Sequence, residues 1–195
     1  MSGVSDIGAD LDSKLVNTVY NDDGKVSYIL AKDDSCRNTL SVVYGPGREK
    51  WTATECNYRF LDKHSFALVS SADLFYGNNY VRKSENNSVT EQYFLDNGVI
   101  LIQKDGEQTF YQSFVDSQGS ILSVFDREGN QVFKASYDAW GNQTVEQNDI
   151  DLRFGYCGHE MLPEFRLIDM GGRVYDPVLG RFLSCDRSAT KETLA

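Results

Sequence analysis

The chain alternates short runs of strand-forming residues with short polar turns along most of its length. From residue 15 onwards, runs rich in Val, Ile, Thr, Tyr and Phe are separated by a few residues that include Asp, Asn or Gly. This pattern is typical of antiparallel strands joined by tight turns. We therefore expect strands at residues 15–20, 26–31, 39–44, 50–53, 58–60, 66–69, 89–94, 99–103 and 108–114. Residues 73–80 are aromatic and ambiguous, and one helical turn is an alternative there.

Two turns carry the residues that hairpins favour. The sequences Asp96-Asn97-Gly98 and Asp105-Gly106 each lie between runs of strand-forming residues. Asn, Asp and Gly tolerate the left-handed backbone that a tight hairpin turn requires. Both segments therefore predict hairpins.

A short repeat follows these hairpins. An apolar or aromatic residue is followed by Asp, two variable positions, Gly, and then Asn or Ser, and the aspartates recur after 10 and then 12 residues. This period is too short for a helical repeat and suits a strand plus a turn, in which Asp binds the backbone two residues on and Gly supplies the left-handed position. The predicted turn residues are Asp116, Gly119, Asp126, Gly129, Asp138 and Gly141, together with Pro177 and Gly180 further along.

These patterns predict an all-β chain of consecutive antiparallel hairpins that form a long, twisted, curling sheet. We expect a loose N-terminal lead-in at residues 1–15, one β domain at 16–186 and a short tail at 187–195. The 24 aromatic residues and only 3 prolines also favour strands over helices.

Composition excludes several classes of function. Hydrophobic residues make up 41% and charged residues 25% of the chain, which is not a disordered composition. The net charge of −10 argues against binding to nucleic acid or to an anionic membrane, because both would repel it. No apolar run is long enough to insert into a membrane, and the first ten residues lack the pattern of a signal peptide. We expect no cofactor.

The four cysteines favour free, mostly buried thiols over a disulfide framework. None of them has Cys-x-x-Cys spacing, and His64 and His159 are the only histidines. We therefore expect no structural zinc or other metal site.

Two C-terminal blocks resemble a known family. Residues 171–186 contain Arg-Val-Tyr-Asp-Pro, then Gly-Arg-Phe-Leu-Ser and a final Asp, and residues 154–160 read Phe-Gly-Tyr-Cys-Gly-His-Glu. With the repeat, these blocks resemble the RHS-repeat-associated core, or YD-repeat, family over roughly residues 89–186. The resemblance implies that this chain is a structural module of a β-shell that encloses and delivers a toxin, secreted or displayed at the cell surface. A cytoplasmic location remains an alternative, because the chain carries no signal peptide.

The same resemblance implies a second hypothesis, an aspartyl autoprotease. The motif positions are Arg173, Asp176 and Asp186. Cys185 stands where the family has proline, Cys157 stands where it has threonine, and no Asp-Pro-x-Gly cleavage sequence follows Asp186. We therefore favour a structural role, in which Asp176 caps the turn before Pro177 and Arg173 pairs with a carboxylate.

Other candidate chemistry is weaker. His159 with Glu160 suits acid–base work, and Cys157 with His159 suits a thiol nucleophile, but a lone histidine in a turn is more often structural. A third hypothesis is a carbohydrate-binding surface module, whose aromatic residues would stack on sugars. For Trp51 and Trp140 we favour core or cross-strand positions.

The expected partners follow from these hypotheses. A sheet with too few hairpins to close leaves an edge strand that invites self-association, unless the acidic first residues blunt it. The other expected partners are a glycan and the remainder of a longer RHS shell.

Overall fold

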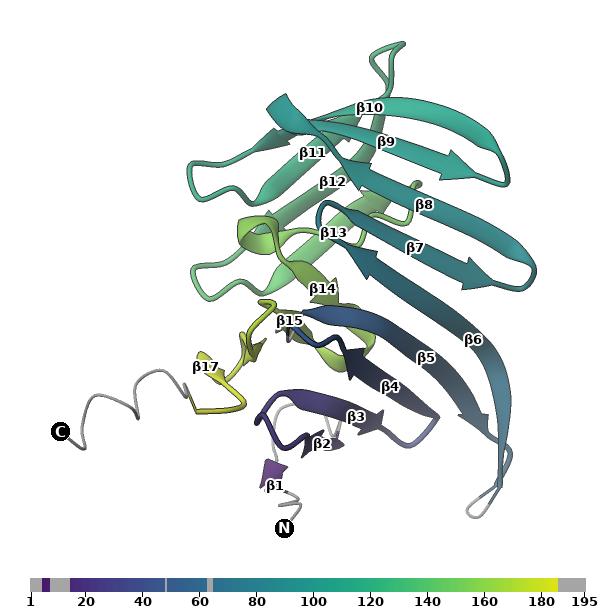
Figure 1. Ribbon diagram of the computed structural model, residues 1–195, viewed down its shortest axis with the longest axis vertical. Helices are drawn as coiled ribbons and strands as arrows, with labels where there is room; N and C mark the ends of the chain where they lie inside the picture. The colour runs from purple at the N-terminus through teal and green to yellow at the C-terminus, as the bar shows by residue number, and fades with distance from the viewer. Residues whose placement is uncertain (1–4, 8–14, 48, 63–64, 186–195) are drawn as a thin grey trace, which may run out of the picture.

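A single antiparallel sheet runs through most of the molecule (Figure 1). The computed structural model describes residues 5–7, 15–47, 49–62 and 65–185. Thirteen strands of this part of the chain lie in sequence order, and each is antiparallel to the next. They are β1 (Ser5–Ile7), β2 (Leu15–Tyr20), β3 (Val26–Lys32), β4 (Cys36–Tyr44), β5 (Lys50–Phe60), β6 (Phe66–Gly77), β7 (Tyr80–Glu85), β8 (Ser88–Phe94), β9 (Val99–Lys104), β10 (Glu107–Val115), β11 (Ile121–Phe125), β12 (Gln131–Tyr137) and β13 (Gln143–Asn148). The all-β prediction of consecutive hairpins in a curling sheet is therefore confirmed.

Two local expectations need correction. Residues 5–7 of the expected loose lead-in form β1, which pairs with β2. Residues 73–77, for which a helical turn was an alternative, belong to the long strand β6. In β6 the buried Ala72 and Leu74 alternate with the exposed Asp73 and Phe75, and this period of two is that of a strand with one buried face.

The Asp and Gly residues of the short repeat close the turns after β10, β11 and β12. Asp116 Oδ1 accepts the backbone N–H groups of residues 118 and 120 at 2.8 Å, and Asp138 Oδ1 does the same for residues 140 and 142 at 2.8 and 2.9 Å. Asp126 Oδ1 accepts the N–H of residue 130 at 2.7 Å. The glycines of these turns have φ angles of 86–92°, a region that is costly for other residues.

The C-terminal segment, residues 149–185, turns back and lies against the face around which the sheet curls (Figure 1). We call this segment the plug. It contains a second small sheet made of β14 (Glu160–Leu162), β15 (Leu167–Asp169), β16 (Val174–Asp176) and β17 (Arg181–Phe182). The short 3₁₀ turns are η1 (Asp96–Gly98) in the large sheet, and η2 (Tyr156–Gly158) and η3 (Pro163–Phe165) in the plug.

Two apolar clusters join the plug to the large sheet. In the first, Leu162, Phe165, Leu167 and Val174 of the plug pack against buried residues of β3 to β7. In the second, Leu152 packs against buried residues of β9, β11 and β12. At roughly 1.5–3 kcal/mol for each fully buried large apolar side chain, these contacts make the plug part of the core.

The tryptophans and cysteines lie closer to solvent than expected. Trp51 and Trp140 are 48% and 60% exposed, so the expectation of core positions is wrong. The ring of Trp140 instead covers Gly180, whose φ is 63° and where an added Cβ would lie 3.2 Å from the ring. All four cysteines are free, but Cys185 is exposed and the others are half-buried, because their strands or turns face solvent on one side.

The repeat glycines give a first prediction. Valine at Gly129 or Gly141 should cost roughly 1 kcal/mol or more in backbone strain. Gly141→Val should be clearly worse, because its Cβ would lie 2.9 Å from the Tyr156 ring and 3.1 Å from Ile168, whereas a Cβ at Gly129 meets nothing within 4 Å. Thermal melts of both variants test this order, and equal melting temperatures would contradict it.

Candidate functional site

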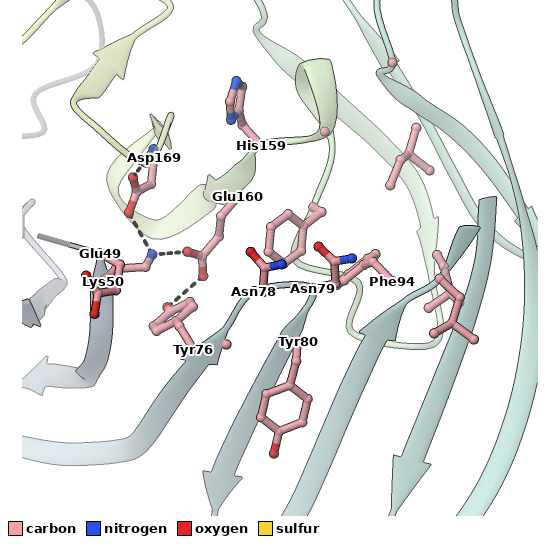
Figure 2. A pocket seen from close by; sticks show the side chains of 18 of the residues that line it. Glu49, Lys50, Tyr76, Asn78, Asn79, Tyr80, Phe94, His159, Glu160 and Asp169 are labelled. Atoms are coloured by element: carbon pink, nitrogen blue, oxygen red, sulfur yellow. Dashed lines mark hydrogen bonds and ion pairs between the residues drawn. The ribbon is translucent and has the colours of Figure 1, made fainter. Parts of the chain in front are cut away.

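Three charged side chains meet where the plug touches the middle of the large sheet. Lys50 at the start of β5 reaches Glu160 of β14 and Asp169 of β15 (Figure 2). The distance from Lys50 Nζ to Asp169 Oδ2 is 2.7 Å, and Nζ also donates to Glu160 Oε2. Only 12%, 3% and 9% of the three side chains is exposed. One lysine therefore joins two separate strands of the plug to the sheet.

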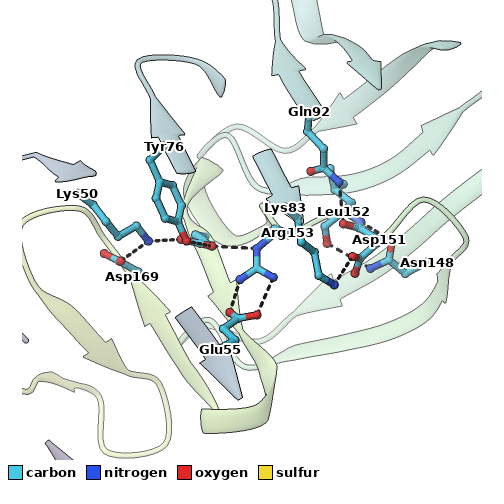
Figure 3. Close-up of polar contacts among 11 residues, drawn as sticks. Lys50, Glu55, Tyr76, Lys83, Gln92, Asn148, Asp151, Leu152, Arg153 and Asp169 are labelled. Atoms are coloured by element: carbon cyan, nitrogen blue, oxygen red, sulfur yellow. Dashed lines mark hydrogen bonds and ion pairs between the residues drawn. The ribbon is translucent and has the colours of Figure 1, made fainter. Parts of the chain in front are cut away.

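A second cation extends this cluster on the other side of Glu160 (Figure 3). Arg153 Nε donates to Glu160 Oε1 at 3.0 Å, and the two terminal nitrogens of Arg153 donate to the carboxylate of Glu55 on β5. The hydroxyl of Tyr76 also donates to Glu160 Oε1, at 2.9 Å. We call Lys50, Glu55, Tyr76, Arg153, Glu160 and Asp169 the charged cluster. Each carboxylate and each cation within it has a partner across the boundary between sheet and plug.

The chain that enters the plug is also fixed by hydrogen bonds. Gln92 of β8 donates its side-chain amide to the carbonyl oxygens of Ile150 and Asp151, at 3.3 and 2.8 Å (Figure 3). Asn148 exchanges two hydrogen bonds with the backbone of Leu152. These contacts place Arg153, the next residue, where its guanidinium meets Glu55 and Glu160.

The charges in the cluster stabilise one another. Burial alone would raise the pKa of Glu160, but the charges of Lys50 and Arg153 and the hydrogen bonds they donate outweigh burial and lower it. Burial would lower the pKa of Lys50, and the carboxylates of Glu160 and Asp169 raise it instead. Burial and the charge of Glu160 raise the pKa of Tyr76, so its hydroxyl stays protonated and donates. The cluster is therefore an ionised salt-bridge network at neutral pH.

A pocket of about 1130 Å³ opens beside the charged cluster. Figure 2 shows Asn78 and Asn79 of the turn between β6 and β7, the Phe94 ring and His159 around it. His159 is half-buried, and burial lowers its pKa, although the charge of Asp169 works in the opposite direction. An imidazole with a lowered pKa is neutral at pH 7. The pocket therefore combines an apolar wall with one neutral imidazole and carboxylates already held by cations.

The residues of the predicted protease motif lie elsewhere, at the far end of the plug. Asp176 ends β16, and its Oδ1 accepts the backbone N–H groups of Val178 and Leu179 at 2.9 Å. The guanidinium of Arg173 lies over the Phe182 ring, 3.8 Å from its centroid. Asp186 lies outside the described residues. The structure therefore shows Asp176 as a turn cap before Pro177 and does not place it relative to the second carboxylate.

The other candidate residues do not form a catalytic arrangement. In the described part of the chain, no hydrogen bond joins the Cys157 thiol to His159. Cys157 lies in η2 with a φ of 48°, and its backbone N–H donates to Ser120 Oγ at 3.1 Å. Glu160, the neighbour of His159, is engaged by Lys50, Arg153 and Tyr76. Sequence reasoning considered Glu160 only for acid–base work and missed the rest of the cluster.

Comparisons with known proteins agree with this architecture. A sequence profile of the family described as Teneurin YD-shell matches residues 74–195. The "tRNA3(Ser)-specific nuclease WapA" of Bacillus spizizenii is 30% identical over 177 residues, and the "tRNA nuclease WapA" of Bacillus subtilis is 31% identical over 176 residues. Each alignment covers 84% of this chain, which spans only 7% of the length of either relative.

Solved structures share the fold. The crystal structure of TcdB2-TccC3 superposes with a TM-score of 0.69 at 16% identity, over 93% of this chain and 10% of that one. A second structure, TcdB2-TccC3-Cdc42, gives a TM-score of 0.68 at 15% identity. At these identities the likeness concerns the fold alone.

The charged cluster predicts a large effect of removing one carboxylate. Glu160→Gln leaves Lys50 and Arg153 buried with a weaker partner, and breaking a buried ion pair costs roughly 3–5 kcal/mol. The matched control is Glu146→Gln, which breaks an exposed pair with Lys134 and should cost at most about 1 kcal/mol. Urea unfolding of both variants measures the difference, and similar losses would contradict a buried network.

The lowered pKa of Glu160 also predicts an acid dependence. Because the folded-state pKa lies below the ordinary value of 4.5, the stabilisation is fully present above that value and is lost as the pH falls through the folded-state pKa. The native chain should therefore lose stability more steeply than Glu160→Gln below pH 4.5. Urea midpoints measured at a series of pH values would show this, and parallel curves would contradict it.

Proposed function

Because the chain belongs to the Teneurin YD-shell family, we propose that it is a non-catalytic wall module of an RHS-type shell. Its hairpins build part of a curved wall, and its plug lines the inside of that wall. The observation that carries this proposal is the docking of the plug by two apolar clusters and a fully paired charged cluster. Groups that are held in structural pairs are poorly available for chemistry, which favours a scaffold over a catalyst.

The cargo of such a shell is a further part of the proposal. We infer that the chain helps to enclose and deliver a toxic domain at the bacterial cell surface or outside the cell. Two features support this inference: the Bacillus relatives are described as tRNA nucleases, and this chain matches only a small part of each. Nuclease activity is a property of those proteins. In the described residues, no helix is both long and apolar enough to cross a membrane.

The remainder of a longer shell is the partner that this role requires. The large sheet is open at β1 and at β13 in the described part of the chain, and an open edge can continue into further hairpins. A glycan is the partner under the third hypothesis, and the exposed Trp51 is the kind of residue that stacks on sugars. A glycan array would separate the two, since a saturable, specific signal would favour the carbohydrate-binding module.

The test of the wall module against the aspartyl autoprotease is an intact-mass time course. We expect the mass of the purified chain to stay constant over days, because Asp176 Oδ1 caps a turn and no Asp-Pro-x-Gly sequence follows Asp186. Asp176→Asn is the matched control. A product that accumulates with time in the native chain and is absent in Asp176→Asn would overturn the non-catalytic proposal.

A further inference from the structure

The hairpin of β5 and β6 is longer than its neighbour in the sheet. The two strands have 11 and 12 residues, whereas β7 has 6 and pairs with β6 only from Ala72 to Gly77. Residues 66–71 of β6 therefore pair with β5 on one side. On the other side they have no strand partner within the described residues. Figure 1 shows this end of the hairpin extending beyond β7.

The open segment lacks the features that protect natural edge strands. Its sequence is Phe-Ala-Leu-Val-Ser-Ser, without charge or proline, although edge strands are usually blunted by Lys, Pro or inward charges. Leu68 and Val69 are 56% and 64% exposed. Val69 is the extra residue of a bulge opposite Asn57 and Tyr58, which twists the strand locally and leaves the residues on either side extended.

Side chains on the neighbouring strands hold this end of the hairpin in shape. The Phe66 ring packs edge to face on Tyr58 and Phe60, with centroid distances of 5.2 and 6.4 Å. The guanidinium of Arg37 on β4 lies 5.1 Å from the Phe66 ring centroid. A strand that is already ordered loses less conformational entropy when another strand pairs with it. The open segment is therefore a preformed template.

We propose that residues 66–71 are a docking edge for the same segment of a second copy of this chain. A two-fold axis places a strand antiparallel to its own copy, which is the pairing used throughout this sheet. Charge selects this occupant and this place. Copies that each carry a net charge of −10 repel one another, and an uncharged segment lets two copies pair without opposing like charges.

Sedimentation velocity over a range of concentrations tests the proposal. The native chain should form a dimer whose fraction rises with concentration. Val69→Lys should weaken the dimer about tenfold or more, because two ammonium groups would meet near the two-fold axis. Leu68→Lys is a second variant with the same expectation. The matched control is Val43→Lys, which adds the same charge at an equally exposed position (57%) on the interior strand β4 and should leave the dimer unchanged.

Circular dichroism melts show which variants are folded, and only those enter the comparison. A native chain that stays monomeric at every concentration would overturn the proposal. So would a dimer that persists in both edge variants, which would place the contact at β1 or β13 instead. Equal weakening by Val43→Lys would show a general effect of charge and would overturn it as well.

Discussion

The packing of the plug against the sheet depends on a small number of buried charges. Lys50 and Glu55 come from the sheet, and Arg153, Glu160 and Asp169 come from the plug or its entrance. Each ion taken out of water costs several kcal/mol unless partners replace the lost hydration. Here the partners exist only when the plug lies in one position. Apolar contacts alone would tolerate a shift of the plug, whereas the charged cluster opposes it.

The large sheet provides the surface that makes this arrangement possible. Short turns keep consecutive strands adjacent, and the strands alternate buried and exposed side chains, so one face of the sheet becomes continuously apolar. The plug covers that face and adds apolar residues of its own. Local turn chemistry therefore builds the wall, and contacts between distant parts of the chain close its inner side.

The wall could be predicted from sequence because its causes are local. An aspartate that binds the backbone two and four residues on, as Asp138 does, is visible in the sequence as a spacing. Strand β6 was harder to predict, because the aromatic residues at its end hide the alternation of Ala72 and Leu74. The charged cluster could not be predicted, since Lys50 and Glu160 are 110 residues apart and no spacing rule connects them.

Backbone hydrogen exchange tests most directly whether sheet and plug form one cooperative unit. If the charged cluster and the apolar clusters hold the plug as described, the amides of β14 and β15 should exchange as slowly as those of β4 and β5, by unfolding of the whole domain. If the amides of β14 and β15 exchange much faster while β4 and β5 stay protected, the plug opens independently. That result would contradict the account.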